Sequence, residues 1–325
     1  MNIFITGATG FIGSKLTQKL ALNGHNIRVL IRNPQKAKVL EHSNIRIYIG
    51  DISDQGMLKD AMSDCDWVFH LAAYTKVWAR DRDIYYKYNV KGTENVLNCA
   101  KESGIKRVII ISTAGVLGPS DGGSISESTV RQMDFFTEYE RTKSLADEKA
   151  MSFAGQQPEI IILYPTRVFG PGLLSESNSV TKLIDAYARG KWRIIPGNGK
   201  KLGNYVYIDN LVDGIIKAAE LGKPGSRYIL GGSDVSYNDF FETIARVTGK
   251  SYFMIKIPLG FALAISWILT FLAKITGNPP LLTPAWVRKY LHDWSTSSSK
   301  AVKELGYQTG NFEDEVERTW QWLKS

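Results

Sequence analysis

Two hydrophobic periodicities alternate along the first half of the chain. Short runs of apolar, often β-branched residues are separated by segments in which apolar residues recur every three or four positions. The runs predict strands over residues 2–6, 27–31, 45–49, 67–71, 107–111 and 160–164. The segments between them predict helices over residues 14–22, 55–62, 83–103 and 137–154.

Strands that alternate with helices in this rhythm form right-handed βαβ units, so we expect a parallel sheet with helices on both faces. The runs at 108–111 and 160–163 are apolar at every position, which is typical of strands buried on both sides. The pattern therefore predicts an α/β fold with a doubly wound parallel Rossmann sheet.

The alternation of strands and helices becomes less regular after Pro165, where stretches rich in glycine and proline separate short elements. The expected elements there are strands at 205–208 and 227–230 with a helix at 210–221 between them, and then helices from 237 onward. We expect a dinucleotide-binding domain over 1–165, to which 203–225 returns. A smaller, mostly helical substrate-binding lobe would occupy 166–325.

The first predicted strand runs directly into a turn that contains Gly7, Gly10 and Gly13, and this turn opens the first helix. A helix N-terminus carries about half a positive charge and unpaired N–H groups, so it suits the pyrophosphate of a dinucleotide. Gly7 would allow the tight turn, Gly10 the approach of a phosphate, and Gly13 close packing of helix on strand. The spacing is G-x-x-G-x-x-G, which differs from the usual G-x-G-x-x-G.

Tyr139 and Lys143 lie four positions apart in a predicted helix and therefore share one face. A nearby ammonium stabilises a phenolate, so Tyr139 could exchange a proton with a carbonyl or an alcohol. The strand before them ends at Ser112 and Thr113, and strand carboxyl ends face the ligand crevice in such sheets. We expect one of the two hydroxyls to face the pocket and the other to face the sheet or a backbone amide.

Composition excludes several classes of protein. The formal net charge is +8, but no dense run of Lys and Arg suggests nucleic-acid binding. The two cysteines, Cys65 and Cys99, have no metal-like spacing, so we expect no metal site and a reducing, cytoplasmic location. No segment reads as a signal peptide.

The longest apolar stretch covers 259–273, with Lys256 and Lys274 on either side. It is shorter than the ~20 residues that span a bilayer, so we expect no transmembrane segment. The stretch is predicted to be a buried helix, and the alternative is that 257–274 contacts a membrane surface or forms a re-entrant segment.

Several motifs together resemble the extended short-chain dehydrogenases/reductases of the NAD-dependent epimerase/dehydratase superfamily. They are 6–13, Gly50-Asp51, His70-Leu71-Ala72-Ala73, Asn89-Val90-Lys91-Gly92-Thr93, Tyr139-x-x-x-Lys143, 205–210 and 305–307. Within this group, residues 164–172 are similar to dihydroflavonol reductase relatives, and 135–143 to the farnesol dehydrogenase branch.

The resemblance implies that Thr113 is the active-site hydroxyl, Tyr139 the general acid/base and Lys143 its electrostatic partner. Many relatives have serine at the hydroxyl position, so Ser112 is the alternative. Asp51 and Ile52 would meet the adenine, and Pro165 would lie near the nicotinamide. The full predicted set of cofactor contacts is Gly7, Thr9, Gly10, Phe11, Ile12, Gly13, Arg32, Asp51, Ile52, Leu71, Ala72, Ala73, Asn89, Ser112, Tyr139, Lys143 and Pro165.

Structural roles compete with these assignments at three positions. Asp51 could instead cap the turn before the next helix. Asn89 could be a buried residue that ties two loops together, a role compatible with cofactor contact. His70 lies in an apolar strand and is predicted to be a hydrogen-bonded core histidine rather than a catalyst.

Arg32 follows the second predicted strand, where NAD-selective Rossmann folds place an acidic residue that binds the ribose 2′-OH. A guanidinium suits a 2′-phosphate, and Lys36 or Lys38 could add to it. This position favours NADP(H) over NAD(H), although resembling enzymes with arginine here include NAD users.

The leading hypothesis is an oxidoreductase that transfers hydride between a nicotinamide and a ketone, aldehyde or alcohol on an apolar small molecule. The alternative is a nucleotide-sugar epimerase or dehydratase with tightly bound NAD, for which Arg189, Arg193 and Arg227 are candidate pyrophosphate ligands. A catalytically silent dinucleotide sensor is a third hypothesis. A homodimer built on two helices is also compatible with the resemblance.

Overall fold

A seven-stranded sheet forms the centre of the N-terminal part of the molecule. The structure, a computed structural model, describes residues 1–76, 78–280 and 282–325. The strand order is β10-β6-β5-β4-β1-β2-β3, and every pair is parallel. The strands are β1 (Asn2–Thr6), β2 (Asn26–Ile31), β3 (Ile45–Ile49), β4 (Trp67–His70), β5 (Arg107–Ile111), β6 (Glu159–Pro165) and β10 (Arg227–Leu230).

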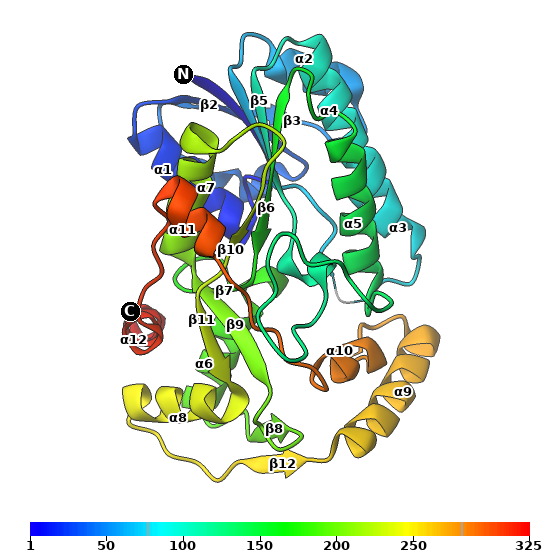
Figure 1. The fold of residues 1–325 in the computed structure, drawn as a ribbon, viewed down its shortest axis with the longest axis vertical. Helices are drawn as coiled ribbons and strands as arrows, with labels where there is room; N and C mark the ends of the chain where they lie inside the picture. Colours follow the sequence, from blue (N-terminus) through cyan, green and yellow to red (C-terminus); the bar gives the residue numbers. More distant parts are fainter. Residues whose placement is uncertain (77, 281) are drawn as a thin grey trace.

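Helices cover both faces of this sheet (Figure 1). Successive strand residues point to opposite faces, so Ile3 and Ile5 pack in one apolar cluster and Phe4 in the other. The first cluster includes α1 (Phe11–Leu22), α7 (Ile208–Leu221) and α11 (Ser299–Leu305), and the second includes α2 (Gln55–Met62), α4 (Gly92–Glu102) and α5 (Glu138–Met151). The predicted doubly wound α/β fold is confirmed.

The helix predicted over 83–103 is interrupted by a π-helical turn. It consists of α3 (Asp83–Tyr85), the π turn Tyr86–Lys91 and α4. Such turns widen a helix by one residue and are frequent at functional sites. Asn89, one of the predicted cofactor contacts, lies within the turn. Further short turns are the 3-10 segments Pro34–Leu40, Ala114–Leu117 and Glu176–Asn178.

The segment 203–225 contributes to both parts of the molecule. Its first residues belong to β9 (Leu202–Tyr207), which joins β7 (Arg167–Phe169) and β11 (Ser233–Ser236) in a separate three-stranded sheet. The following helix α7 packs beside α1 on the main sheet, and β10 then extends that sheet next to β6.

The C-terminal lobe packs around aromatic side chains. Its helices are α6 (Ser179–Ala188), α8 (Tyr237–Thr248), α9 (Leu259–Thr276), α10 (Pro284–Lys289) and α12 (Phe312–Lys324). Phe169, Tyr205, Phe240 and Phe312 form a continuous set of ring contacts in its core. The pattern did not predict β7, β11 or the pair β8 (Ile194–Pro196) and β12 (Ile255–Ile257), because strands of three or four residues show no clear alternation.

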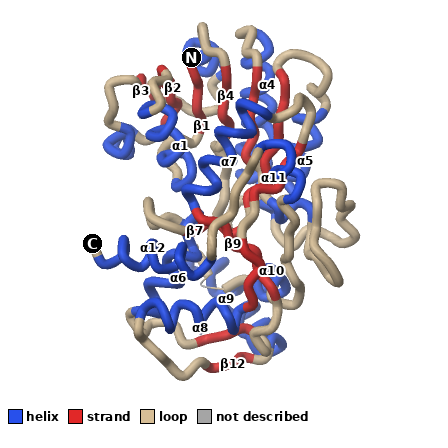
Figure 2. The backbone as a smooth tube through the Cα atoms, turned by 60° about the vertical axis from the view of Figure 1, so that its left-hand side comes forward, coloured by secondary structure: helices blue, strands red, loops and turns tan. Residues whose placement is uncertain are grey.

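The expectation of a buried helix at 259–273 is wrong. Helix α9 lies at the outside of the lobe (Figures 1 and 2), and only Ser266 and Ala273 among its residues are buried. It extends to Thr276, so its 18 residues are long and apolar enough, by length and composition, to cross a membrane. Apolar composition predicts burial only where another layer covers the element, and the lobe places α10 against one side of α9.

Candidate active site

The glycine turn between β1 and α1 has a geometry that larger residues would disrupt. Gly7 has a positive φ of 73°, and a Cβ there would lie 2.6 Å from the backbone nitrogen of Ala72. A Cβ at Gly13 would lie 2.1 Å from the carbonyl oxygen of Gly7. The turn is closed by the amide of Gly10, which donates to the carbonyl of Gly7 at 3.0 Å.

This turn fits a phosphate group. Gly10 is the N-cap of α1, and no side chain caps the first turn of the helix. The positive end of the helix dipole and its unpaired amides therefore face outward beside the exposed Gly10. The predicted contacts Thr9 and Ile12 are half-buried here, whereas Phe11 is buried and lies 3.0 Å from the Cβ position of Gly172, in the loop after β7. Gly7, Gly10 and Gly13 are thus positioned to hold a dinucleotide pyrophosphate.

Arg32 and Asp51 lie together at the carboxyl ends of β2 and β3. Nε of Arg32 is 3.9 Å from Oδ2 of Asp51, and the guanidinium lies 5.0 Å from the ring centre of Tyr88. Asp51 also accepts hydrogen bonds from the amide and hydroxyl of Ser53 at 2.9 and 2.8 Å. Asp51 therefore caps a turn and partly neutralises the charge of Arg32. The N-cap of α2 is a different residue, Asp54. Arg32 remains largely exposed and can reach a ribose at this edge.

His70 connects the glycine turn to the π turn through buried hydrogen bonds. The Thr6 hydroxyl accepts from the amide of Ala72 at 3.2 Å and lies 2.8 Å from His70 Nδ1. His70 Nε2 lies 3.0 Å from the Thr93 hydroxyl, which donates to the carbonyl of Asn89 at 2.7 Å. Because the Thr93 proton goes to Asn89, His70 donates to Thr93 at Nε2, and in a neutral ring Nδ1 then accepts from the Thr6 hydroxyl.

Burial lowers the pKa of His70 to about 3, and the charge of Lys143 acts in the same direction. The prediction that His70 is a hydrogen-bonded core residue is confirmed. Leu71, Ala72 and Ala73 follow it at the end of β4, half-buried beside Gly7. Ile52, which follows the end of β3, is buried against the position of Gly92.

Asn89 joins the loop after β4 to helix α5. Its side-chain oxygen accepts from the amide of Tyr74 at 2.7 Å. Its nitrogen donates to the carbonyl of Tyr74 and to the hydroxyl of Thr142, at 3.2 and 2.9 Å. The side chain is fully buried, so the predicted tie between two segments is present. It fixes α5 at the residue next to Lys143.

Three polar residues recur at four-residue intervals along the inner face of α5: Tyr139, Lys143 and Asp147. Lys143 is buried and its Nζ donates to the carbonyl of Ile111, at the end of β5, at 2.9 Å. Asp147 accepts a hydrogen bond of 2.8 Å from the hydroxyl of Ser112. Burial raises the pKa of Asp147 to about 6, against the opposing effect of Lys143.

The two hydroxyls at the end of β5 have different surroundings. Ser112 is buried against Asp147, whereas Thr113 is half-buried, and among the described residues its hydroxyl has one hydrogen-bond partner, the amide of Gly115, which donates to it at 3.2 Å. A Cβ at Gly115 would lie 3.4 Å from the Thr113 hydroxyl and 3.3 Å from Glu140. Gly115 therefore allows Thr113 to approach the first turn of α5, where Tyr139 lies.

The pKa of Tyr139 reflects its burial, and the stabilisation of its phenolate by Lys143 stays a prediction. Desolvation raises this pKa above its usual range, and the carboxylates of Asp147 and Glu140 raise it further. The Lys143 ammonium donates to the Ile111 carbonyl, and among the described residues no hydrogen bond joins it to Tyr139. Burial therefore favours the protonated form of Tyr139.

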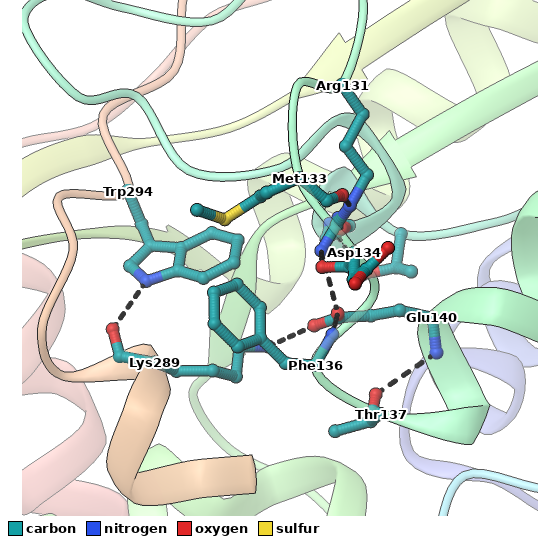
Figure 3. A network of polar contacts seen from close by, with 10 residues as sticks. Arg131, Met133, Asp134, Phe136, Thr137, Glu140, Lys289 and Trp294 are labelled. Atoms are coloured by element: carbon teal, nitrogen blue, oxygen red, sulfur yellow. Dashed lines mark hydrogen bonds and ion pairs between the residues drawn. The ribbon is translucent and has the colours of Figure 1, made fainter.

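A buried carboxylate lies next to Tyr139 and joins three segments (Figure 3). Glu140 is 1% exposed, lies 2.5 Å from Lys289 Nζ and 3.5 Å from Arg131, and accepts from the amide of Phe136 at 3.1 Å. Arg131 also donates to the carbonyls of Gly115, Met133 and Asp134. The network attaches α10 and the loop 131–137 to the helix that carries Tyr139.

The sequence interpretation did not single out Asp147, Glu140, Arg131 or Lys289. The interval of four residues from Tyr139 to Lys143 continues to Asp147, and that continuation was a usable signal. Lys289 lies far from Glu140 in the sequence, and no local pattern indicates their pairing. The remaining predicted residue, Pro165, is buried at the end of β6 beside Leu230.

The family model described as "NAD dependent epimerase/dehydratase family" matches residues 3–231. The chain belongs to this family. The match begins in β1 and ends just after β10, so it covers the main sheet, the glycine turn, Thr113, Tyr139 and Lys143. The protein is an NAD(P)-dependent dehydrogenase/reductase of the extended short-chain type, as the motifs predicted.

Two curated relatives match nearly the whole chain. A protein of Synechocystis sp. with the provisional name dihydroflavonol 4-reductase is 28% identical over 99% of this chain and 94% of its own. The 4-hydroxy-2-methyl-3-oxo-4-farnesyl-3,4-dihydroquinoline-1-oxide ketoreductase of Stigmatella aurantiaca is 28% identical over 94% of this chain and 92% of its own.

Solved structures show the same fold. The crystal structure of gox2253 superposes with a TM-score of 0.84 at 28% identity, covering 99% of this chain and 97% of that one. UDP-glucuronic acid 4-epimerase from Bacillus cereus, in complex with UDP-glucuronic acid and NAD, superposes with a TM-score of 0.80 at 24% identity, covering 100% and 99%. A nucleotide-sugar epimerase thus shares this architecture with the present chain.

Proposed function

We propose that the protein reduces a ketone or aldehyde, or oxidises the corresponding alcohol, on an apolar small molecule. The observation that carries the proposal is the placement of Tyr139 and Lys143 on one face of α5, with Thr113 at the adjoining strand end. A bound nicotinamide supplies or accepts the hydride. The glycine turn, the strand ends at Arg32 and Asp51, and the loop after β4 would hold its dinucleotide.

Each residue of this set has a distinct proposed role. Tyr139 moves the proton at the reacting oxygen, and its raised pKa favours the protonated form that carbonyl reduction requires. Thr113, whose hydroxyl proton is free to donate, orients the same oxygen. Lys143 is held by Ile111 and supplies positive charge beneath the site.

The lobe supports an apolar rather than a sugar-nucleotide substrate. Of the three cations considered for a second pyrophosphate, Arg189 pairs with Asp185 and Arg193 stacks 3.5 Å from the ring centre of Tyr252. Arg227 lies in β10 of the main sheet. They do not converge, which weakens the epimerase alternative. The farnesyl-bearing compound named for the Stigmatella relative also favours an apolar body.

We further propose a preference for NADP(H), which rests on Arg32. Its guanidinium is largely exposed at the end of β2 and can pair with a 2′-phosphate. Asp51 offsets part of this charge at 3.9 Å, so the preference is expected to be moderate. The family as a whole is described as NAD dependent.

The test is oxidation of NADPH and NADH by the purified protein with a panel of isoprenoid, steroid-like and flavonoid-like carbonyls. We expect turnover with at least one apolar carbonyl, and Tyr139→Phe should lower kcat about 100-fold or more with little change in cofactor affinity. Tyr86→Phe, which removes an exposed hydroxyl, is the matched control. Absence of turnover across the panel would contradict the proposal. Tightly bound NAD together with sugar-nucleotide turnover would establish the epimerase alternative, and activity unaffected by Tyr139→Phe would exclude the proposed acid/base role.

A further inference from the structure

Helix α9 presents an apolar stripe to solvent. Its exposed large residues have exposed fractions between 47 and 68%: Phe261, Trp267, Ile268, Phe271, Leu272 and Ile275. The last five recur at intervals of three or four positions, and Phe261 lies two helical turns before Ile268, so all six share one side of the helix. The segment that leads into α9 adds Phe253, which is 86% exposed, and Ile255. Soluble monomers rarely leave such a contiguous apolar surface in water, so this face is expected to have a partner.

The opposite side of α9 is attached to the protein. Ser266 and Ala273 are its buried residues, and they are small enough for close approach of a neighbouring segment. Helix α10 packs against α9, and Figures 1 and 2 show α9 lying along the lobe, away from the main sheet. One face is therefore docked and the other is apolar and exposed, as in a helix that lies in an interface plane.

The charges around this helix have one sign. No aspartate or glutamate occurs between Glu242 and Asp293. Lys256 precedes the helix and Lys274 lies in its last turn; both are exposed, and in the part of the chain that the structure describes neither makes an ion pair. Lys250 and Arg288 add further exposed positive charge.

We propose that this α9 face docks on the surface of an anionic lipid bilayer, with the helix lying in the plane of the membrane. Apolar and aromatic side chains would enter the boundary between headgroups and acyl chains, and the flanking lysines would meet anionic headgroups. A second copy of the chain is a poorer partner, because two such faces would bring like charges together. A spanning helix would have to give up its packing against α10.

The α9 face is linked to the active site through α10, which suggests a function for the proposed membrane contact. Helix α10 packs on α9 and carries Lys289, which pairs with Glu140 beside Tyr139. A substrate dissolved in the bilayer would reach the lobe from this side. The docking itself does not depend on the proposed hydride transfer, and its test measures binding.

The test is flotation of the full-length protein with vesicles of phosphatidylcholine alone or with about 30% phosphatidylserine. We expect binding that increases with the anionic lipid and weakens with salt. Trp267→Ser/Phe271→Ser should weaken binding about tenfold or more, and Lys256→Gln/Lys274→Gln should reduce the preference for anionic lipid about tenfold.

Matched controls use equally exposed residues on distant elements. Leu22→Ser/Leu221→Ser and Lys182→Gln/Lys303→Gln should leave binding unchanged. Circular dichroism of every variant verifies folding. If Trp267→Ser/Phe271→Ser binds vesicles weakly but still turns over a water-soluble carbonyl, then it has lost membrane docking and kept the proposed activity.

Bromine-labelled lipids distinguish a surface helix from a spanning one. The fluorescence of Trp267 is obtained as the difference between the emission of wild type and that of Trp267→Phe. It should be quenched most by bromine near the headgroups, about 5–10 Å into the membrane. Quenching greatest at the bilayer centre would overturn the in-plane orientation. Absence of vesicle binding would overturn the proposal, and a concentration-dependent dimer lost in Trp267→Ser/Phe271→Ser would assign the face to self-association.

Discussion

Burial sets the protonation states of the polar residues around Tyr139. Burial lowers the pKa of His70 to about 3, so its ring is neutral, whereas burial raises the pKa of Asp147 to about 6. The two groups have opposite effects on the pH dependence of stability. Between its folded and unfolded pKa values, His70 binds a proton only in the unfolded state, so it lowers stability as pH falls. Asp147 has a higher pKa in the folded state, so between its two pKa values it binds a proton only when folded. It therefore raises stability as pH falls.

The contribution of His70 can be isolated by substitution. The free energy of unfolding of the wild type minus that of His70→Gln should fall by about 2 kcal/mol between pH 7 and pH 5. The reason is that the folded pKa of about 3 lies far below the unfolded value of 6.5. Denaturant unfolding at each pH measures this difference, with His42→Gln as the control. A difference that does not vary with pH would mean that His70 takes up its proton as readily in the folded protein as in the unfolded chain.

Arg32 gives a second prediction at the scale of one residue. Arg32→Ala should lower kcat/KM for NADPH about tenfold or more relative to NADH, since a charge-assisted pair to the 2′-phosphate would be lost. Arg46→Ala, which removes an exposed guanidinium near the start of β3, should leave the ratio unchanged. An equal effect on both cofactors would assign Arg32 to adenine stacking or to pairing with Asp51 instead.

At the scale of elements, the Glu140 network attaches α10 to α5. Glu140→Gln should destabilise the protein by about 3 kcal/mol, because Lys289 and Arg131 would keep their charges with the carboxylate removed. Asp185→Asn, which breaks an exposed pair with Arg189, should cost at most about 0.5 kcal/mol. Thermal or denaturant unfolding compares the two. If Glu140→Gln costs as little stability as Asp185→Asn, then water solvates the charges of the Glu140 network.

The glycine turn is an element whose geometry leaves no space for a side chain. Gly13→Ala should abolish dinucleotide binding, because its Cβ would overlap the Gly7 carbonyl and displace α1 from β1. Gly56→Ala in α2 is the control, since a Cβ there meets nothing closer than 3.4 Å and alanine favours helix. Titration calorimetry measures binding, and an unimpaired Gly13→Ala would show that the turn can relax.

At the scale of the whole molecule, the proposed dinucleotide site combines residues from the ends of β1 through β6, so binding should stabilise these strands as a unit. Cofactor at 100 times its Kd should stabilise the folded state by about 2.7 kcal/mol and raise Tm by about 5 °C. Nicotinamide alone, which lacks the pyrophosphate, should give no shift. A thermal scan with each compound checks this, and equal shifts would place the main contacts at the nicotinamide rather than at the glycine turn.

Local sequence patterns specified the main sheet because its strands and helices have the right periodicity and its turns have the required glycines. Strands at 227–230 and a helix at 55–62 were predicted with the observed bounds. The short strands of the lobe were missed, because three or four residues carry too little alternation. The network of Glu140, Arg131 and Lys289 was also missed, because it joins residues that only folding brings together.

The sequence alone determined the α/β architecture, the glycine turn, and the shared face of Tyr139 and Lys143, because each depends on spacing within a few residues. Only the tertiary structure decided which hydroxyl of β5 stays unburied, which direction the pKa of Tyr139 shifts, and whether α9 is covered. These properties depend on what packs against a residue from elsewhere in the chain. Burial and the charges of distant neighbours arise in the folded molecule and leave no local pattern.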